Sequence, residues 1–212
     1  MIANNRTFFC LILIALALII SFGVSAGAQE SNTVIHEEGV KVMDRAIFAG
    51  GCFWCMQPPF EKLNGVTGVF SGYTGGTGLN PTYEDYAQKG HLEAVEITYD
   101  PSKIKYSKLL EVFWRQIDPT DSGGQFCDRG TQYRAAIFYL NGEQKQLAGQ
   151  SKEELGKSGR YEKPIVTEIL KASAFYKAED YHQDYYKNNP VRYKFYRFSC
   201  GRDRYLEKIW GK

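Results

Sequence analysis

A pair of cysteines separated by two aromatic residues, in the segment Gly50-Gly51-Cys52-Phe53-Trp54-Cys55, is the part of the sequence best suited to chemistry. A short apolar run, 45–49, precedes the two glycines, which indicates a strand that turns sharply into a helix. The first amides of a helix have no backbone partner, and the helix dipole adds positive potential at the same end. Both effects favour a thiolate. The sequence therefore predicts that Cys52 is a nucleophile with a lowered pKa.

Cys55 lies three residues after Cys52 and therefore on the same face of the expected helix. It is close enough to form a local disulfide if the first turn adjusts. A buried pair of structural thiols and a zinc site are alternatives, but one C-x-x-C motif and three scattered histidines offer no second ligand pair. A thioredoxin-like thiol–disulfide oxidoreductase is the main rival, since C-x-x-C after a strand also marks that fold. The expected order of elements argues against a parallel redox sheet.

The first 28 residues form a segment of their own. Arg6 is the only charged residue before Glu30, an apolar run follows from Phe8 to Ile20, and Ala26-Gly27-Ala28 offers a small-residue cleavage site. This pattern is typical of a secretory signal peptide, so we expect residues 1–28 to be removed and the protein to be exported, to the periplasm or another extracytoplasmic space. The alternative is an uncleaved membrane anchor over residues 8–24.

Composition indicates one globular domain, 45–212, after a polar lead-in over 29–44. Of the 212 residues, 43% are apolar and 15% aromatic, more than a disordered chain would carry. The balance of 26 basic against 24 acidic residues gives no global field for nucleic acid, and we expect no nucleic-acid partner.

Cys10 would leave with the signal peptide. Four of the five cysteines then remain, in a compartment where disulfides persist: Cys52, Cys55, Cys127 and Cys200.

Hydrophobic periodicity predicts alternating strands and helices along the chain. We expect strands over 45–49, 66–73, 91–99 and 133–140, and helices over 52–63 and 106–117. This β-α-β-β-α-β order is the ferredoxin-like arrangement, so the expected fold is an α+β two-layer sandwich with a long C-terminal extension. In the extension we expect a helix over 141–157, a strand over 165–170, a helix over 175–188 closed by Pro190, and a strand or wrapping segment over 192–195.

The sequence resembles the peptide methionine sulfoxide reductase A family, in its C-F-W-C variant, through a series of motifs in the family's order. They are Gly51-Cys52-Phe53-Trp54, Gly72-Tyr73-Thr74-Gly75-Gly76, Asn80-Pro81-Thr82-Tyr83, Gly90-His91-Leu92-Glu93-Ala94-Val95, Tyr99-Asp100-Pro101, Phe113-Trp114 with Asp118-Pro119, Asp128-Arg129-Gly130-Thr131-Gln132-Tyr133-Arg134, and Ala178-Glu179-Asp180-Tyr181-His182-Gln183. The resemblance implies reduction of the S epimer of methionine sulfoxide, free or within oxidised proteins, to methionine. It implies no metal and no cofactor.

The resemblance also implies an acid for this reaction. Attack by the Cys52 thiolate on the sulfoxide sulfur requires that the oxygen is protonated or strongly hydrogen-bonded at the same time. Glu93, within the alternating strand 91–99, matches the family's acid, and burial would raise its pKa. Alternation alone leaves open that Glu93 faces solvent.

Further residues match the family's substrate site. Tyr83 and Tyr133 match the phenols that bind the sulfoxide oxygen, as neutral donors in the manner of an oxyanion hole. Asp128 matches the polar residue at the rim of the site, and a turn or cap role is equally possible. Phe53 and Trp54 supply an apolar slot for the S-methyl group, because sulfur–aromatic contacts are favourable.

A resolving cysteine must follow the nucleophile, because a sulfenic acid left on Cys52 condenses readily with a neighbouring thiol. We rank the candidates Cys55, then Cys200, then Cys127, whose alternative role is packing. Some family members carry C-F-W-C at this place, whereas many others use cysteines in a glycine-rich tail that this chain lacks. The resulting disulfide would be reduced by a thioredoxin-like partner. We expect a monomer, with membrane contact only if the N-terminal segment stays uncleaved.

Overall fold

The computed structural model describes residues 42–211. The predicted signal peptide (1–28), the alternative anchor (8–24) with Cys10, and nearly all of the lead-in (29–44) lie outside the described residues. Within 42–211, no helix is long and apolar enough to cross a membrane.

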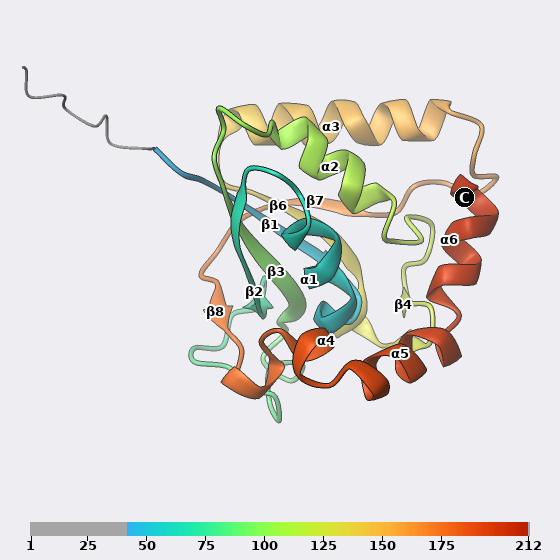
Figure 1. The fold of residues 1–212 in the computed structure, drawn as a ribbon. Helices are drawn as coiled ribbons and strands as arrows, with labels where there is room; N and C mark the ends of the chain where they lie inside the picture. The colour runs from blue at the N-terminus through green and yellow to red at the C-terminus, as the bar shows by residue number, and fades with distance from the viewer. Residues whose placement is uncertain (1–41, 212) are drawn as a thin grey trace, which may run out of the picture. The chain divides into compact units, whose positions relative to one another are not determined.

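A six-stranded sheet in the order β7-β6-β1-β3-β2-β8 forms the core of the described chain (Figure 1). Its strands are β1 (Asp44–Gly50), β2 (Val66–Thr74), β3 (Leu92–Tyr99), β6 (Ala135–Tyr139), β7 (Glu168–Lys171) and β8 (Tyr176–Lys177). Neighbouring strands are antiparallel, except that β7 runs parallel to β6. The connection from β1 to β6 has the predicted β-α-β-β-α-β order, which confirms the α+β fold.

Three helices cover one face of this sheet: α1 (Phe53–Glu61), α2 (Tyr106–Trp114) and α3 (Gly142–Lys157). The polar helix α3 was predicted, and its ends carry the expected signals. Asn141 accepts a hydrogen bond from the Gln144 amide at the N-cap, and Lys157 lies in the last turn. Between α2 and β6 the chain forms a small hairpin of β4 (Gly124–Gln125) and β5 (Asp128–Arg129), then the 3-10 turn η1 (Thr131–Tyr133).

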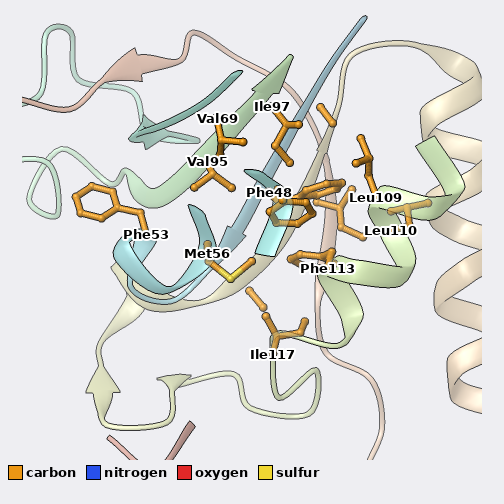
Figure 2. Packing of buried hydrophobic residues seen from close by; sticks show 14 of the residues in the cluster. Phe48, Phe53, Met56, Val69, Val95, Ile97, Leu109, Leu110, Phe113 and Ile117 are labelled. Atoms are coloured by element: carbon orange, nitrogen blue, oxygen red, sulfur yellow. The ribbon is translucent and has the colours of Figure 1, made fainter. Parts of the chain in front are cut away.

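The two faces of the sheet bury alternate residues of each strand, as a period of two requires. In β1, Phe48 stacks on Phe113 of α2, with ring centroids 4.9 Å apart (Figure 2). It also stacks on Phe60 of α1, with centroids 5.5 Å apart. In β3, Val95 and Ile97 belong to the same core. Glu93 lies on the same face of β3 as Val95 and Ile97, because the three are two residues apart. The sheet therefore directs the Glu93 side chain toward the helices rather than into solvent.

The C-terminal extension differs from the prediction, which was wrong for the helix over 175–188. This stretch holds strand β8, the 3-10 turn η2 (Asp180–His182) and the short helix α4 (Tyr185–Asn188). Lys177 pairs with Gly72 of β2, and the Thr74 hydroxyl donates to the Ala174 carbonyl. The open edge of β2 thus takes up this segment, and tertiary pairing overrides its helical spacing.

The strand predicted over 192–195 was also wrong, because these residues lie in α5 (Pro190–Ser199). Pro190 begins this helix rather than closing the one before it, since the first helical position needs no amide donor. A last helix, α6 (Arg202–Trp210), follows Gly201. α5 contacts α1 through a hydrogen bond from Arg197 to the Cys55 carbonyl. At the end of α6, the Arg115 and Arg160 guanidinium groups lie over the Trp210 ring.

Candidate functional site

Cys52 lies in the turn between β1 and α1, and the glycine before it makes this turn possible. Gly51 has a φ of +77°, and a Cβ there would lie 2.6 Å from Cβ of Gln125 and 2.9 Å from Nη2 of Arg202. Cys52 is the N-cap residue of α1 and is 6% exposed. The turn therefore presents the thiol at the start of a helix and nearly out of solvent.

A pocket of about 90 Å³ opens at this thiol. Pockets for drug-sized ligands hold roughly 300 Å³ or more, so this one fits the end of a single side chain. It gathers every residue that the sequence predicted as catalytic or substrate-binding, together with one that it missed: Cys52, Phe53, Trp54, Tyr83, Glu93, Asp128, Tyr133 and Tyr196. The resolving candidates Cys55, Cys127 and Cys200 are outside its lining.

Glu93 is 2% exposed, which excludes the solvent-facing alternative. Its carboxyl accepts hydrogen bonds from the Phe53 amide, at 2.9 Å, and from the Tyr86 hydroxyl, at 3.0 Å. These two bonds oppose the effect of burial, but burial is larger and raises the pKa of Glu93 to about 8. The carboxyl therefore holds its proton near neutrality and can act as an acid. Tyr86 was missed, because nothing in the sequence separates it from the other tyrosines.

Tyr83 and Tyr133 line the pocket from two loops. The Tyr83 amide donates to Glu179 at 2.9 Å, which anchors a residue whose ring is otherwise 40% exposed. Tyr133 lies in η1, directly before β6. Burial and the nearby Glu93 raise the pKa of both phenols, so both hydroxyls stay protonated and can donate to an oxygen in the pocket.

The apolar side of the pocket is held rigidly by Trp54 and Phe53. Nε1 of Trp54 donates to Nδ1 of His182 at 3.0 Å, and its ring stacks on Tyr185 with centroids 3.7 Å apart. Burial lowers the pKa of His182, which keeps the imidazole neutral and able to accept this bond. Phe53 is 1% exposed, and its ring lies between those of Tyr73 and His182. Two fixed aromatic rings therefore form an apolar wall of the pocket.

The thiols of Cys52 and Cys55 interact, and each shifts the pKa of the other. Burial and the neighbouring Cys55 raise the pKa of Cys52, whereas the hydrogen bond from Cys52 and the charges of Arg202 and Arg197 lower the pKa of Cys55 to about 6. Within the pair, Cys55 is therefore the more acidic thiol, and Cys52 is the thiol that holds its proton more firmly. The predicted lowered pKa of Cys52 was wrong for the free protein.

Occupied amides at the start of α1 add to the effect of burial, which is the largest cause of the raised pKa. The Phe53 amide donates to the Glu93 carboxyl, and the Cys55 amide donates to the Cys52 carbonyl at 3.0 Å. The Cys52 side chain makes no capping hydrogen bond. Two of the amide donors expected to stabilise a Cys52 thiolate, those of Phe53 and Cys55, are therefore already occupied.

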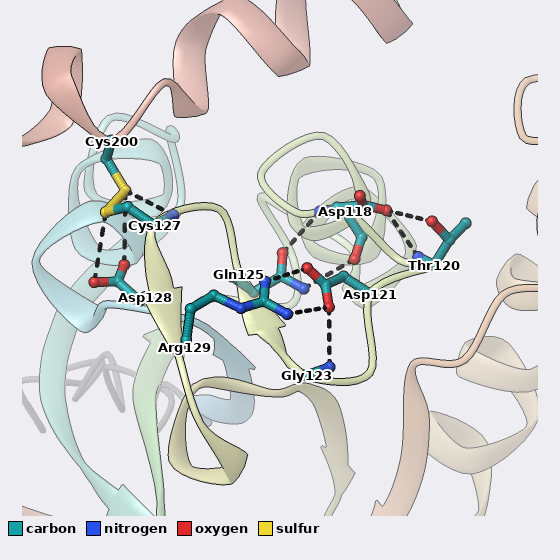
Figure 3. Close-up of polar contacts among 9 residues, drawn as sticks. All are labelled: Asp118, Thr120, Asp121, Gly123, Gln125, Cys127, Asp128, Arg129 and Cys200. Carbon is teal, nitrogen blue, oxygen red and sulfur yellow. Dashed lines mark hydrogen bonds and ion pairs between the residues drawn. A yellow bond between two sulfur atoms is a disulfide. The ribbon is translucent and has the colours of Figure 1, made fainter.

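Cys127 and Cys200 form a disulfide across 73 residues of chain, at the rim of the pocket (Figure 3). Cys127 lies in the β4–β5 turn and Cys200 directly follows α5. Asp128 lies beside both sulfurs, at 3.8 and 3.9 Å. These three residues are also close enough to share a metal ion, but their sulfurs are bonded to each other rather than free as thiolates. Among the described residues the free thiols are Cys52 and Cys55.

Tyr196 of α5 completes the pocket, and its hydroxyl donates to Asp128 at 2.6 Å. It lines the same pocket as the Cys52 thiol. Tyr196 was not predicted as a site residue because residues 192–195 were expected to form a strand. They lie in the helix α5, which directs Tyr196 toward the pocket. Asp128 thus holds the Tyr196 phenol in the pocket that Cys52 lines, and it lines this pocket itself.

The chain is similar to a known family over nearly all of its described length. A family model described as peptide methionine sulfoxide reductase matches residues 44–212. The peptide methionine sulfoxide reductase MsrA of Bacillus subtilis is 57% identical over 168 residues, which cover 78% of this chain and 95% of that protein. The MsrA of Bacillus velezensis is 58% identical over 167 residues, 78% of this chain and 94% of that protein.

Solved structures agree with these matches. Mxr1 of Saccharomyces cerevisiae, in its reduced form, matches with a TM-score of 0.65 and 30% identity, over 70% of this chain and 87% of that chain. Methionine sulfoxide reductase A of Corynebacterium diphtheriae matches with a TM-score of 0.63 and 32% identity, over 72% of this chain and 78% of that chain.

Proposed function

The chain belongs to the peptide methionine sulfoxide reductase family and reduces methionine sulfoxide with cysteine chemistry, and we propose that Cys52 is its nucleophile and Glu93 its acid. One observation carries this assignment. The buried carboxyl of Glu93, with a pKa of about 8, lines the same small pocket as the Cys52 thiol. A nucleophile and a protonated acid that meet at one point are what an S–O bond with a poor leaving oxygen requires.

The first step transfers the sulfoxide oxygen to Cys52. The sulfur of Cys52 attacks the sulfoxide sulfur as its proton passes to Cys55, and Glu93 protonates the oxygen. The products are methionine, a sulfenic acid on Cys52 and the carboxylate of Glu93. Cys52 is oxidised by two electrons and the sulfoxide is reduced by two.

Substrate orientation follows from the two sides of the pocket. Tyr83 and Tyr133 offer hydroxyl donors to the sulfoxide oxygen, and Trp54 with Phe53 offers apolar rings to the methyl group. A sulfoxide sulfur is a stereocentre, so fixed places for oxygen and methyl accept one epimer. We expect this to be the S epimer, in oxidised proteins or in the free amino acid.

The second step uses Cys55. Its thiol attacks the Cys52 sulfenic acid, a disulfide forms and water leaves. Cys55 is the first candidate because it is free and lies in the first turn of the helix that Cys52 caps, whereas Cys127 and Cys200 are bonded to each other. A thioredoxin-like dithiol then reduces the disulfide by thiol exchange and resets both cysteines.

Epimer-resolved turnover tests the proposed roles. Full-length protein with dithiothreitol is given peptides that contain either the S or the R sulfoxide, and the methionine product is measured. We expect turnover of the S epimer, its loss in Cys52→Ser and a marked defect in Glu93→Gln. Reduction of insulin disulfides with neither epimer consumed would instead support the thioredoxin-like rival.

Export of the protein is a further part of the proposal. It rests on the signal-like pattern of residues 1–28, and the Cys127–Cys200 disulfide supports it, because such bonds persist mainly in oxidising compartments. Cell fractionation and sequencing of the mature N-terminus test it. We expect an extracytoplasmic protein that begins at Gln29; a full-length chain in the cytoplasmic fraction would contradict export, and a full-length chain in the membrane would support the anchor.

A further inference from the structure

Arg202 is the largest fully buried side chain of the described residues, with 0% of its surface exposed. It begins α6, and its guanidinium group lies under the turn that carries Cys52. Nη2 donates to the Gly50 carbonyl at 3.0 Å, and Nη1 donates to the Gln116 carbonyl at 3.0 Å and contacts Sδ of Met56 at 3.6 Å. Arg202 thus contacts Gly50, which precedes the C-x-x-C segment, and Met56, which follows it.

These contacts leave the charge of Arg202 without a partner of opposite sign. Its hydrogen-bond acceptors are neutral, its Nε has no acceptor, and the Phe126 ring lies 4.6 Å from its central carbon. Within the described part of the chain, no carboxylate lies in ion-pair distance of it. A guanidinium cannot shed its proton, and an uncompensated buried charge costs several kcal/mol. A fold that keeps such a cation needs an anion near it.

Two acidic groups lie in the field of Arg202: the Asp128 carboxyl, which already accepts a hydrogen bond from Tyr196, and the more deeply buried Cys55 thiol of the C-x-x-C pair. Cys55 is 1% exposed, and its pKa is lowered by the charge of Arg202 more than by that of Arg197. Arg197 has a partner of its own, since it is ion-paired with Asp203 and donates to the Cys55 carbonyl. That carbonyl is free because Pro59 has no amide to bond it.

Other groups that face Cys55 act in the opposite direction or carry no charge. Asp128 of β5 raises the pKa of Cys55, and a charge on Glu93 of β3 would do the same. Tyr193 of α5 also faces it, as a neutral phenol whose pKa is raised by burial. Arg202 is therefore the one fully buried cation acting on Cys55 among the described residues that face it.

We propose that Arg202 is the internal counter-ion of the Cys52–Cys55 pair and holds the pair's negative charge on Cys55. The proposal deepens the proposed function and rests on it, because Cys55 must be the resolving thiol for the charge to be used. Arg202 touches neither substrate nor reacting sulfur, so it is a positioning residue that acts through Cys55.

The counter-ion serves both steps of the reaction. In the first, the Cys55 thiolate accepts the proton of Cys52 as Cys52 attacks the sulfoxide. In the second, the cation beside Cys55 eases loss of that proton, which leaves with the hydroxyl of the sulfenic acid as water while the S–S bond forms. After two-electron reduction by a dithiol, the thiolate returns to its place beside Arg202.

The test measures the titration of Cys55 by itself. The full chain with Cys52→Ser keeps a hydroxyl donor beside Cys55 and leaves the Cys127–Cys200 disulfide intact. The rate of Cys55 alkylation by iodoacetamide is followed against pH by mass spectrometry of the peptide that contains Cys55. In this background Arg202→Met removes the charge and keeps the length, and Arg204→Met, at an exposed position of the same helix, is the matched control.

We expect Arg202→Met to raise the midpoint of alkylation by about two pH units, which slows the reaction at pH 7 about tenfold. Arg204→Met should leave the midpoint in place. Arg202→Lys should restore most of the effect, because it keeps the charge. Arg202→Gln provides a second neutral variant should the Met variant fail to fold, as judged by thermal unfolding.

An unchanged midpoint in a folded Met or Gln variant would overturn the proposal. A midpoint in Arg202→Lys that rises as far as in the neutral variant would also overturn it, because geometry rather than charge would then be responsible. Alkylation needs no sulfoxide and no turnover. Its outcome is therefore separate from failure of the proposed function, which epimer-resolved turnover would reveal.

Discussion

Two pairs of cysteines lie around one small pocket, and they differ in every property that decides what a cysteine can do. Cys52 and Cys55 are three residues apart, buried and free. Cys127 and Cys200 are 73 residues apart, lie at the rim and are joined in a disulfide (Figure 3). A bond that closes a long loop removes much entropy from the unfolded chain, whereas a bond within one helical turn removes little.

The difference assigns the pairs to different tasks. The rim disulfide ties the hairpin that carries Asp128 to the end of α5, which carries Tyr196, and so fixes two pocket residues against each other. The buried pair shares one charge and can form and break its bond with small local movement. We propose that one pair supports the site and that the other performs its chemistry.

Replacing Cys52 should produce the largest effect. Cys52→Ser removes the nucleophile and should lower turnover of methionine sulfoxide by at least about 10³-fold, because a hydroxyl neither attacks sulfur readily nor cycles through a sulfenic acid. The release of methionine from a sulfoxide peptide measures it. Residual turnover within tenfold of the wild type would remove Cys52 from the mechanism.

Glu93→Gln should follow, with a loss of about 10²–10⁴-fold in the same assay. The amide is similar in shape and can still hydrogen-bond, but it has no proton to give. Glu93→Asp is the matched variant. It keeps a carboxyl group on a side chain that is one carbon shorter, so it should retain part of the activity. Equal activity of the Gln variant and the wild type would show that Glu93 only shapes the pocket.

The pH profile of the wild-type protein sharpens the assignment of charges. Activity should rise as pH increases through about 6, where Cys55 ionises, and fall as pH increases through about 8, where Glu93 loses its proton. Measurement of kcat/KM from pH 5 to pH 10 checks both limbs. A profile that keeps rising above pH 8 would contradict the role of Glu93 as an acid.

Cys55→Ser should separate the two steps. The first turnover, which releases one methionine per chain, should persist, although more slowly because the thiolate that accepts the Cys52 proton is gone. Turnover with a protein dithiol should fall by roughly two orders of magnitude. Without Cys55, the Cys52 sulfenic acid must react with a thiol of the dithiol protein that arrives by diffusion, rather than with a thiol already held beside it. Rapid-quench and steady-state assays give the two numbers. Unchanged steady-state turnover would mean that another thiol resolves Cys52.

Removing the rim disulfide should affect stability more than chemistry. The double variant Cys127→Ser with Cys200→Ser should lose about 2–4 kcal/mol of the free energy of unfolding, since a long loop is no longer closed. Its turnover should stay within a few-fold of the wild type. Denaturant unfolding measures the first quantity, and a collapse of turnover in a protein that remains folded would show that this pair takes part in the redox cycle.

Much of the fold and the catalytic centre follows from local pattern. Alternation of apolar and polar residues along β3 identifies the strand. Glu93, Val95 and Ile97 are two residues apart and so share one face of the strand, and Glu93 is placed on the buried face once Val95 or Ile97 is known to be in the core. Gly51 before Cys52 predicts the sharp turn into α1. These features depend on neighbours in the chain, which a sequence shows directly.

The remainder depends on partners far along the chain. β8 exists because β2 has an open edge, so the helical spacing of 175–188 was misleading. The Cys127–Cys200 bond joins two segments that no local pattern relates. Arg202 reads as a surface residue in a basic, aromatic stretch, because arginine is seldom fully buried. Its burial, and the direction of the shared charge in the C-x-x-C pair, require the packed structure.

The central claim is that one pair of cysteines cycles while the other stays joined. A single reaction without reductant tests it most directly, in protein whose Cys52 and Cys55 are free and whose rim disulfide is intact at the start. After quenching and alkylation, peptides are mapped by mass spectrometry and released methionine is counted. We predict one methionine per chain, a new bond between Cys52 and Cys55, and an unaltered Cys127–Cys200 bond. A bond from Cys52 to Cys127 or Cys200 would contradict the account.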